Sequence, residues 1–105
     1  MIVTVFRSRA RPSLSPEVLA RLGEIGARMA ELAPKQPGFI SYKDFESADG
    51  EAVTVVEFDT VEHVIAWREQ PEHKAAQQWA RAQVFASYTI HVCEVLRTSR
   101  FEMPD

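Results

Sequence analysis

Apolar side chains recur along this chain with two different periods, and each period predicts a type of secondary structure. Residues 2–8 are mostly β-branched or aromatic, which is typical of a β-strand. A helix is predicted to begin at Ser15, where a capping serine precedes a proline and an acidic residue. Its apolar positions follow at spacings of four, three, four and three residues, until Pro34 ends the helix. They are Val18, Leu22, Ile25, Met29 and Leu32.

A β-hairpin is predicted in the middle of the chain. Residues 39–46 and 52–58 both have strand character, and Asp49-Gly50 between them is a strong signal for a tight turn. We therefore expect these two segments to pair as antiparallel neighbours.

A second helical region and a last strand follow the hairpin. Asp59 and Thr60 are candidates to cap the helix, and Glu62 lies three residues after Asp59, as in a capping box. Pro71 interrupts the helical region, because an interior proline removes a backbone hydrogen bond. A long final strand is predicted over residues 84–96.

The predicted order of elements is β-α-β-β-α-β, the ferredoxin-like arrangement of the α+β class. Four antiparallel strands form one sheet, and the helices cover one of its faces. We expect one domain over residues 1–97 and a C-terminal tail over residues 98–105, because the end of the chain has no clear period.

Both faces of the predicted sheet are apolar. In the first strand, Val3 and Val5 point to one side. Ile2 and Phe6 point to the other, whereas a half-exposed strand should alternate apolar with polar residues. One helix layer cannot cover both faces, so we expect a homodimer in which the sheets of two copies meet. The far end of the last strand could then pair with the partner's sheet; the alternative is that sheet edges and loops hide the second face.

Composition narrows the class of protein. The chain has 105 residues, 46% of them hydrophobic, and a net charge of −3, so it can fold as one domain and general nucleic-acid binding is disfavoured. No apolar run approaches the roughly 20 residues that a membrane span needs. Cys93 is the only cysteine, which excludes a disulfide scaffold, and we interpret it as an inert buried thiol. We expect a cytoplasmic protein with no nucleic-acid or membrane partner.

Four short segments carry a family resemblance. Pro37-Gly38-Phe39 opens the second strand. Val-Val-Glu-Phe-Asp-Thr-Val-Glu-His-Val-Ile-Ala-Trp-Arg follows at residues 55–68, and Pro-Glu-His-Lys-Ala-Ala-Gln at residues 71–77. Phe85 and Tyr88 form a Phe-x-x-Tyr pair at the start of the last strand. Over about residues 1–97 the chain resembles the antibiotic biosynthesis monooxygenase (ABM) domain family of the dimeric α+β barrel superfamily.

The resemblance implies a homodimer of ferredoxin-like subunits whose sheets form a barrel, with a pocket between sheet and helices in each subunit. Some members oxidise polycyclic aromatic substrates with dioxygen and use neither metal nor organic cofactor, and others bind haem and open its ring. It therefore implies a cofactor-independent monooxygenase that acts on a small aromatic or quinol-like compound. A haem-degrading monooxygenase and a non-catalytic dimer that binds a small apolar molecule are the alternatives.

The sequence departs from both of these subgroups. Haem-degrading members have an asparagine near the end of the first strand and a haem-ligating histidine where this chain has Arg7 and Gln77, although Trp67 matches their tryptophan. The positions that align with polar residues of the polyketide-oxidising members are Val55, Asp59 and Ile65. A broad subgroup with Ala-Trp-Arg followed by His-x-x-Ala-Gln is the nearest match.

His73 and Trp67 are the candidate catalytic residues. A neutral imidazole at His73 can act as a general base, because its pKa lies near working pH and a cofactor-independent oxygenase must deprotonate a phenol or enol. Trp67 can stack on a flat ligand and donate its indole N–H. The alternatives are structural: His73 fixes the helix break through hydrogen bonds, and Trp67 belongs to the core.

Five further residues are weaker candidates for ligand binding. Gln77 lies one turn after the candidate base and can orient it or a ligand carbonyl, or it is simply a partly exposed helix residue. Arg81 either attracts an anionic ligand or complements the helix dipole. Phe85 and Tyr42 either line a pocket or belong to the core or an interface. Arg7 either reaches the pocket mouth or lies exposed on the surface.

No metal site is predicted, because His63, His73 and His91 lack the spacing of a ligand motif. We expect a solvated His63 and a structural role for His91. Gly23 and Gly26 are expected to let the first helix pack closely on the sheet or to leave room for a ligand. A pocket of several hundred Å³ that His73 and Trp67 face would favour an enzyme. Solid packing of both residues would favour the non-catalytic alternative.

Overall fold

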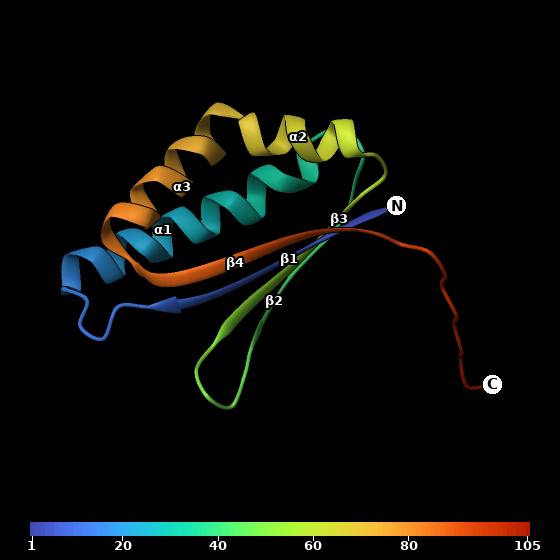
Figure 1. Ribbon diagram of the computed structural model, residues 1–105, viewed down its shortest axis with the longest axis horizontal. Coiled ribbons are helices and arrows are strands. Elements are labelled where there is room, and N and C mark those ends of the chain that lie inside the picture. The colour runs from blue at the N-terminus through green and yellow to red at the C-terminus, as the bar shows by residue number, and fades with distance from the viewer.

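Four antiparallel strands form one sheet in the spatial order β2-β3-β1-β4, and the helices all lie on one side of it (Figure 1). The computed structural model describes residues 1–105. The order of elements confirms the predicted ferredoxin-like α+β fold. The elements are β1 (Ile2–Ala10), α1 (Pro16–Leu32), the short 3-10 helix η1 (Ala33–Lys35), β2 (Phe39–Glu46), β3 (Ala52–Phe58), α2 (Val61–Glu69), α3 (Pro71–Gln83) and β4 (Phe85–Glu94).

The first helix and the hairpin form where the sequence predicts them. Ser15 caps α1, and its Oγ accepts a hydrogen bond from the backbone N–H of Val18 at 3.2 Å. Between β2 and β3, Gly50 has a φ of +88°, a conformation that glycine adopts without steric cost. Of the two alternatives for Gly23 and Gly26, close packing of α1 on the sheet is wrong, because nothing lies within 4 Å of the Cβ that either could carry; both positions have open space beside them.

The start of α2 differs from the predicted capping box. Thr60 is the N-cap, and its Oγ1 accepts from the backbone N–H of His63 at 3.2 Å. Asp59 instead accepts a hydrogen bond from Nδ1 of His63 at 2.6 Å, which lowers the pKa of Asp59. His63 is therefore paired, not simply solvated as expected. Gly38 packs beneath this pair, since a Cβ there would lie 2.1 Å from Oδ1 of Asp59.

The helical region breaks at Pro71, as predicted. Gln70 is both the C-cap of α2 and the N-cap of α3. Its side-chain Oε1 accepts from the backbone N–H of His73 at 2.9 Å. Beyond the break, α3 continues in the same general direction as α2 but at an angle to it, and it lies alongside α1 above the sheet (Figure 1).

The last strand is shorter than the predicted residues 84–96. Val84 belongs to the end of α3, where its N–H bonds to the carbonyl of Ala80, and it is buried. At the other end, β4 pairs with β1, and the pairing finishes at Ile2 opposite Glu94. One further bond joins the N–H of Val95 to the carbonyl of Met1 just beyond this pairing.

The core lies between the sheet and the helices. Phe58 is completely buried, and Val56 lies next to it on the same face of β3. Met29 and Leu32 of α1 and Trp67 of α2 pack onto these two residues. The helices thus cover the β2–β3 half of the sheet most tightly, near the start of α2.

The opposite, outer face of the sheet is uncovered and partly apolar. Val5 of β1 lies between Val55 of β3 and His91 of β4 on this face. Phe45 of β2 is 53% exposed. The prediction that both faces carry apolar side chains is confirmed. Cys93 also lies on the outer face and is exposed, so the prediction of a buried thiol is wrong for this chain.

Residues 95–105 form a tail without regular secondary structure that points away from the fold (Figure 1). Three of its large apolar side chains, Leu96, Phe101 and Met103, are 93%, 86% and 83% exposed. No helix of the protein has the length and apolar character that crossing a bilayer requires.

Candidate functional site

The two candidate catalytic residues meet at the break between α2 and α3. Trp67 lies in the last turn of α2 and is only 6% exposed. His73 lies in the first turn of α3, and its ring stacks on the indole with centroids 3.8 Å apart and planes 12° apart. The break at Pro71 allows this stacking, because it changes the direction of the helix axis between the two residues (Figure 1).

Hydrogen bonding fixes the tautomer of His73. Nδ1 lies 2.8 Å from the backbone carbonyl oxygen of Trp67, which can only accept, so Nδ1 carries the proton. Nε2 is therefore the basic nitrogen. It has no hydrogen-bond partner in the protein. Since no fully buried side-chain nitrogen or oxygen lacks a partner, Nε2 is not fully buried.

Burial lowers the pKa of His73 below its ordinary value of 6.5. The hydrogen bond to the carbonyl of Trp67 acts in the opposite direction but is the smaller effect. His73 is thus neutral at neutral pH. A neutral imidazole with a free Nε2 lone pair is the form that can accept a proton from a substrate.

Gln77 lies beside His73, as the predicted helical spacing requires. Its Nε2 is 3.2 Å from Nδ1 of His73, but a protonated Nδ1 cannot accept. The amide instead donates to the backbone carbonyl of Arg68, at 3.4 Å. Gln77 therefore helps to hold α3 against the end of α2, next to the imidazole.

A groove of about 390 Å³ opens between α1 and α3, beside this pair. Trp79 and Ala76 of α3 and Met29 of α1 contribute apolar surface to it. Ala76 is one turn along α3 from His73. Neither Trp67 nor His73 lines the groove itself, so the base lies next to this space and not within it.

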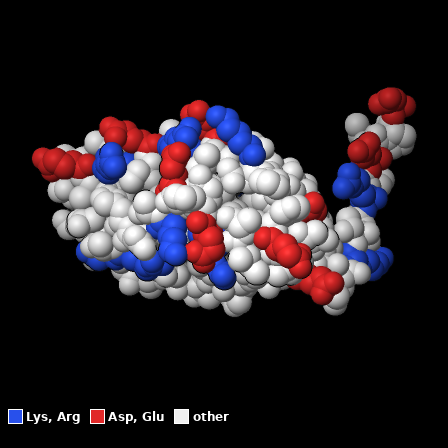
Figure 2. All heavy atoms as spheres, turned by 90° about the horizontal axis from the view of Figure 1, so that it is seen from above, with Lys and Arg blue, Asp and Glu red and all other residues white.

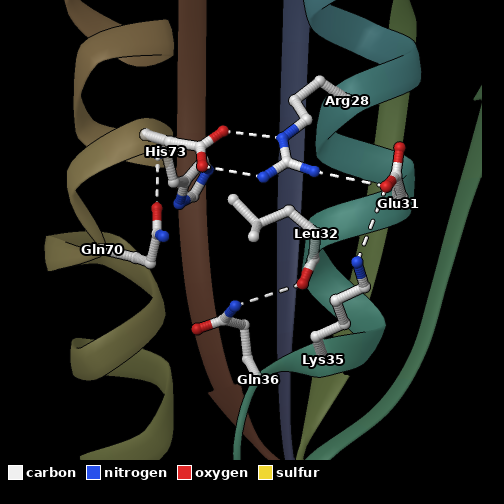
Figure 3. Close-up of polar contacts among 8 residues, drawn as sticks. Arg28, Glu31, Leu32, Lys35, Gln36, Gln70 and His73 are labelled. Carbon is white, nitrogen blue, oxygen red and sulfur yellow. Dashed lines mark hydrogen bonds and ion pairs between the residues drawn. The ribbon is translucent and has the colours of Figure 1, made fainter.

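An ion pair joins the two helices across the groove (Figure 3). The guanidinium of Arg28 donates from Nε and Nη2 to the two carboxylate oxygens of Glu72 at 2.7 and 2.8 Å. Arg28 also donates to Glu31 at 3.3 Å. Glu72 directly precedes His73, so this pair ties the segment that carries the base to α1.

The other predicted ligand-binding residues lie away from His73. Arg7 is on the outer face, where it donates to Glu51 at 2.9 Å. Phe85 packs against Phe6, with ring centroids 5.4 Å apart. Arg81 is an exposed residue near the end of α3.

Tyr42 packs against the buried core, and burial raises the pKa of its hydroxyl to about 12. Of the predicted site residues, the fold therefore brings together Trp67, His73 and Gln77. It leaves Tyr42, like the three residues above, outside that group.

Sequence patterns did not single out two residues that hold the site in place. Gln70 caps the helix that begins with Pro71, and Glu72 ties that helix to α1. For Gln70 the sequence did offer a signal, namely its place directly before a proline that starts a helix. An amide oxygen at this position can accept a hydrogen bond from one of the first free N–H groups of the helix. The partner of Glu72 is distant in sequence, so no local pattern could identify it.

Comparison with known proteins identifies the family. The model of the family described as antibiotic biosynthesis monooxygenase matches residues 1–79. The chain belongs to this family. YqjZ of Bacillus subtilis strain 168, an uncharacterized protein, is 36% identical over 80 residues, which make up 76% of this chain and 70% of YqjZ.

Solved structures share the ABM fold at low sequence identity. A variant of SnoaB, a cofactor-independent oxygenase from Streptomyces nogalater, is similar with a TM-score of 0.73 and 17% identity, over 92% of this chain and 94% of SnoaB. A dimeric ferredoxin-like protein of unknown function from Thermobifida fusca has a TM-score of 0.69 and 13% identity, over 90% of each chain. At these identities the likeness shows the fold alone.

The residues of this ABM chain do not fit haem. Gln77, at the position implied for the haem ligand, presents a neutral amide that is already bonded to the helix before it. Arg7, at the position implied for the asparagine, lies on the face of the sheet away from His73. No group of three His, Cys, Asp or Glu side chains is placed to hold a metal ion.

Proposed function

We propose that this ABM protein is a cofactor-independent monooxygenase that oxidises an electron-rich phenol or quinol with dioxygen. The observation that carries the proposal is the hydrogen bond of His73: Nδ1 lies 2.8 Å from the carbonyl oxygen of Trp67, which leaves Nε2 as the nitrogen that can act as a base. The family supports monooxygenase chemistry, and SnoaB shows that this fold can support an oxygenase without a cofactor.

The reaction needs only the substrate, dioxygen and this base. His73 removes a proton from the phenol or enol, and the resulting carbanion passes one electron to dioxygen. The substrate radical and superoxide then combine, and the imidazolium returns the proton to give a hydroperoxide. Loss of water leaves a carbonyl, so a CH₂ group in the keto form of the substrate and O₂ become C=O and H₂O. Four electrons leave the substrate and four reduce dioxygen.

The groove between α1 and α3 is the candidate entrance for the substrate. Its size, about 390 Å³, is in the range of small-molecule sites. Trp79 gives it an aromatic wall, and its charged side chains are balanced, because Arg21 and Arg28 are paired with Glu24 and Glu72 of the same lining. Two of its lining residues, Glu72 and Ala76, lie within one helical turn of His73.

We also propose that the protein works as a homodimer whose outer sheet faces meet. The uncovered apolar residues of this face support the proposal, because exposing several of them would cost roughly 1.5–3 kcal/mol each. Sedimentation of the purified protein tests it. The expected particle has twice the chain mass of 11.9 kDa, and a folded single chain at micromolar concentration would contradict it.

Oxygen labelling tests the proposed chemistry. Protein freed of metal with a chelator is mixed with a panel of phenols, hydroquinones and naphthols under ¹⁸O₂. The expected result is one dioxygen consumed and one labelled oxygen incorporated per product molecule. Labelled oxygen from water, or no uptake above the protein-free rate across the panel, would contradict the proposal.

A second candidate is a non-catalytic dimer that binds a small apolar molecule. The position of the groove favours it, because neither Trp67 nor His73 lines this space and Trp67 is buried in the core. It predicts that an aromatic probe binds saturably, which is measured by the quenching of Trp79 fluorescence, and that no oxygen is taken up. Oxygen uptake with the same probe would exclude it.

A further inference from the structure

The first turn of α3 is anchored to two different helices. His73 faces α2, where its Nδ1 bonds to the carbonyl of Trp67 and its ring stacks on that indole. Glu72, the residue before it, faces α1, where its carboxylate accepts hydrogen bonds from Arg28 at 2.7 and 2.8 Å. Neighbouring side chains of a helix point about 100° apart. Two anchors in these directions fix the rotation of the turn about the helix axis, which one anchor cannot do.

The pair of Arg28 and Glu72 is the polar link between α1 and α3. No other hydrogen bond or ion pair joins these two helices. The groove of about 390 Å³ separates them beside the pair, and every residue that lines it belongs to α1 or α3. The pair therefore holds the near end of α3 to α1 on the side where the groove keeps the helices apart.

A network on α1 holds Arg28 in place. Acidic and basic side chains lie next to one another over the helical side of the molecule (Figure 2). Among them, Arg28 donates to Glu31 at 3.3 Å, and Glu31 also lies 3.5 Å from Nζ of Lys35 (Figure 3). Isolated surface ion pairs contribute little, whereas bidentate geometry and networks are the cases in which they contribute measurably. The pair of Arg28 and Glu72 has both features.

We propose that Arg28 and Glu72 are positioning residues for His73: their ion pair fixes the first turn of α3, so that Nδ1 stays on the carbonyl of Trp67 and Nε2 stays free. The inference rests on the proposed role of His73 as the base. Without the pair, the turn rotates, the ring leaves the carbonyl, and the proton is no longer confined to Nδ1. A ring that carries its proton on Nε2 in part of the molecules is a poorer base toward the substrate.

A direct contact with the substrate is the competing role, because Arg28 and Glu72 both line the groove. The two roles differ in what they change. Loss of a binding contact raises KM and leaves His73 of the substrate-free protein as it was. Loss of positioning lowers kcat and alters the proton on His73 before any substrate is added.

Nitrogen NMR of the ¹⁵N-labelled, substrate-free protein at neutral pH shows which ring nitrogen of His73 carries the proton. In the unaltered protein we expect the proton on Nδ1 alone. Glu72→Gln and Arg28→Met each remove the ion pair, and in each the two nitrogen signals are expected to move toward one another, as in a mixture of tautomers. Urea unfolding verifies that both variants fold. Unchanged His73 signals in both variants would overturn the proposal.

Glu69→Gln is the matched control. Glu69 is as exposed as Glu72 and pairs with Lys74, the residue after His73, at 2.9 Å. This pair joins α3 to α2, which the hydrogen bonds at the helix break already do. Glu69→Gln is therefore expected to leave the His73 signals unchanged. A shift as large as that of Glu72→Gln would overturn the proposal, because any nearby charge would then have the same effect.

Kinetics test the consequence for the reaction, on the phenol or quinol that the labelling experiment identifies. Glu72→Gln and Arg28→Met are each expected to lower kcat at least about threefold, because a small misplacement of a catalytic group is costly. The double variant should be no slower than either single variant, since both changes remove one interaction. Glu69→Gln should keep the kcat of the unaltered protein. A raised KM with unchanged kcat, or a kcat that increases, would overturn the proposal.

The two readouts separate this inference from the proposed function. Mixed tautomers in the Glu72 and Arg28 variants, together with no oxygen uptake by the unaltered protein, would support the positioning of His73 and contradict the oxygenase. Oxygen uptake that requires His73, but is unchanged in both variants along with its NMR signals, would overturn the positioning role and leave the oxygenase standing.

Discussion

The imidazole of His73 lies flat against the indole of Trp67, with 3.8 Å between ring centroids. The same tryptophan also accepts the Nδ1 hydrogen bond through its backbone carbonyl. One residue therefore fixes the plane, the tautomer and part of the burial of the candidate base. This double contact depends on the helix break, because a continuous helix would place residues six apart on different faces.

The pKa of His73 is expected to lie below 6.5 in the folded protein, since burial disfavours the charged ring. As the pH falls below about 6.5, the unfolded chain binds a proton that the folded chain does not, so the free energy of unfolding falls until the folded-state pKa is reached. NMR titration of the ring and urea unfolding between about pH 5 and 8 measure both effects. His73→Asn keeps a side-chain N–H near the carbonyl of Trp67. It should remove the contribution of His73 to the pH dependence of the free energy of unfolding. An unshifted titration would argue against burial of the ring.

Removing the indole of Trp67 is expected to destabilise the fold. Because the side chain is buried between α1, α2 and the sheet, Trp67→Ala should lower the free energy of unfolding by about 3–5 kcal/mol. Trp67→Phe keeps an aromatic partner for His73 and should cost less. Trp79→Ala, at the half-buried wall of the groove, is the control and should cost less than Trp67→Ala in urea unfolding. Equal losses at both positions would contradict the assigned core.

The sequence predicted the architecture well because its signals are local. The period of α1, its Ser15 cap, the Asp49-Gly50 turn and the break at Pro71 each depend on residues close together in the chain. The apolar character of both sheet faces was also readable, because strand side chains alternate strictly.

The site was predictable only in part. His73 and Gln77 share a helix face, so their proximity follows from spacing, but the stacking on Trp67 depends on the angle of the break. For Arg7 the sequence left two positions open, and the structure shows the exposed one, because strand alternation places this side chain on the outer face. The tie between Arg28 and Glu72 joins positions 44 residues apart and has no sequence signature.

Gly38 is expected to be far less tolerant of a side chain than Gly50. Both have positive φ angles, +77° and +88°, so alanine carries backbone strain of about 1–3 kcal/mol at either position. At Gly38 the new Cβ would also collide with Asp59 and His63, whereas Gly50 has open space. Thermal unfolding of Gly38→Ala and Gly50→Ala measures the difference. Equal destabilisation would mean that the Asp59–His63 pair moves aside freely.

Substitution of two phenylalanines on opposite faces of the sheet distinguishes an effect on folding from an effect on dimerisation. Phe58→Ala should cost about 3–5 kcal/mol of unfolding free energy, because Phe58 is completely buried by its own helices. Phe45→Ala should leave the stability of the single chain nearly unchanged and weaken the dimer, since Phe45 lies on the open outer face. Urea unfolding and sedimentation distinguish the two. A Phe45 variant that dimerises normally would count against the outer face as the interface.

The central claim is that the free Nε2 of His73 is the base of a cofactor-independent oxygenation, and one comparison tests it most directly. Oxygen uptake is followed with an electrode for the unaltered protein, His73→Asn and the exposed control His91→Asn, on the phenol or quinol that the labelling experiment identifies. We expect His73→Asn to reduce kcat/KM by about 10²–10⁴-fold while His91→Asn stays close to the unaltered protein. Equal turnover by His73→Asn and the unaltered protein would contradict the claim.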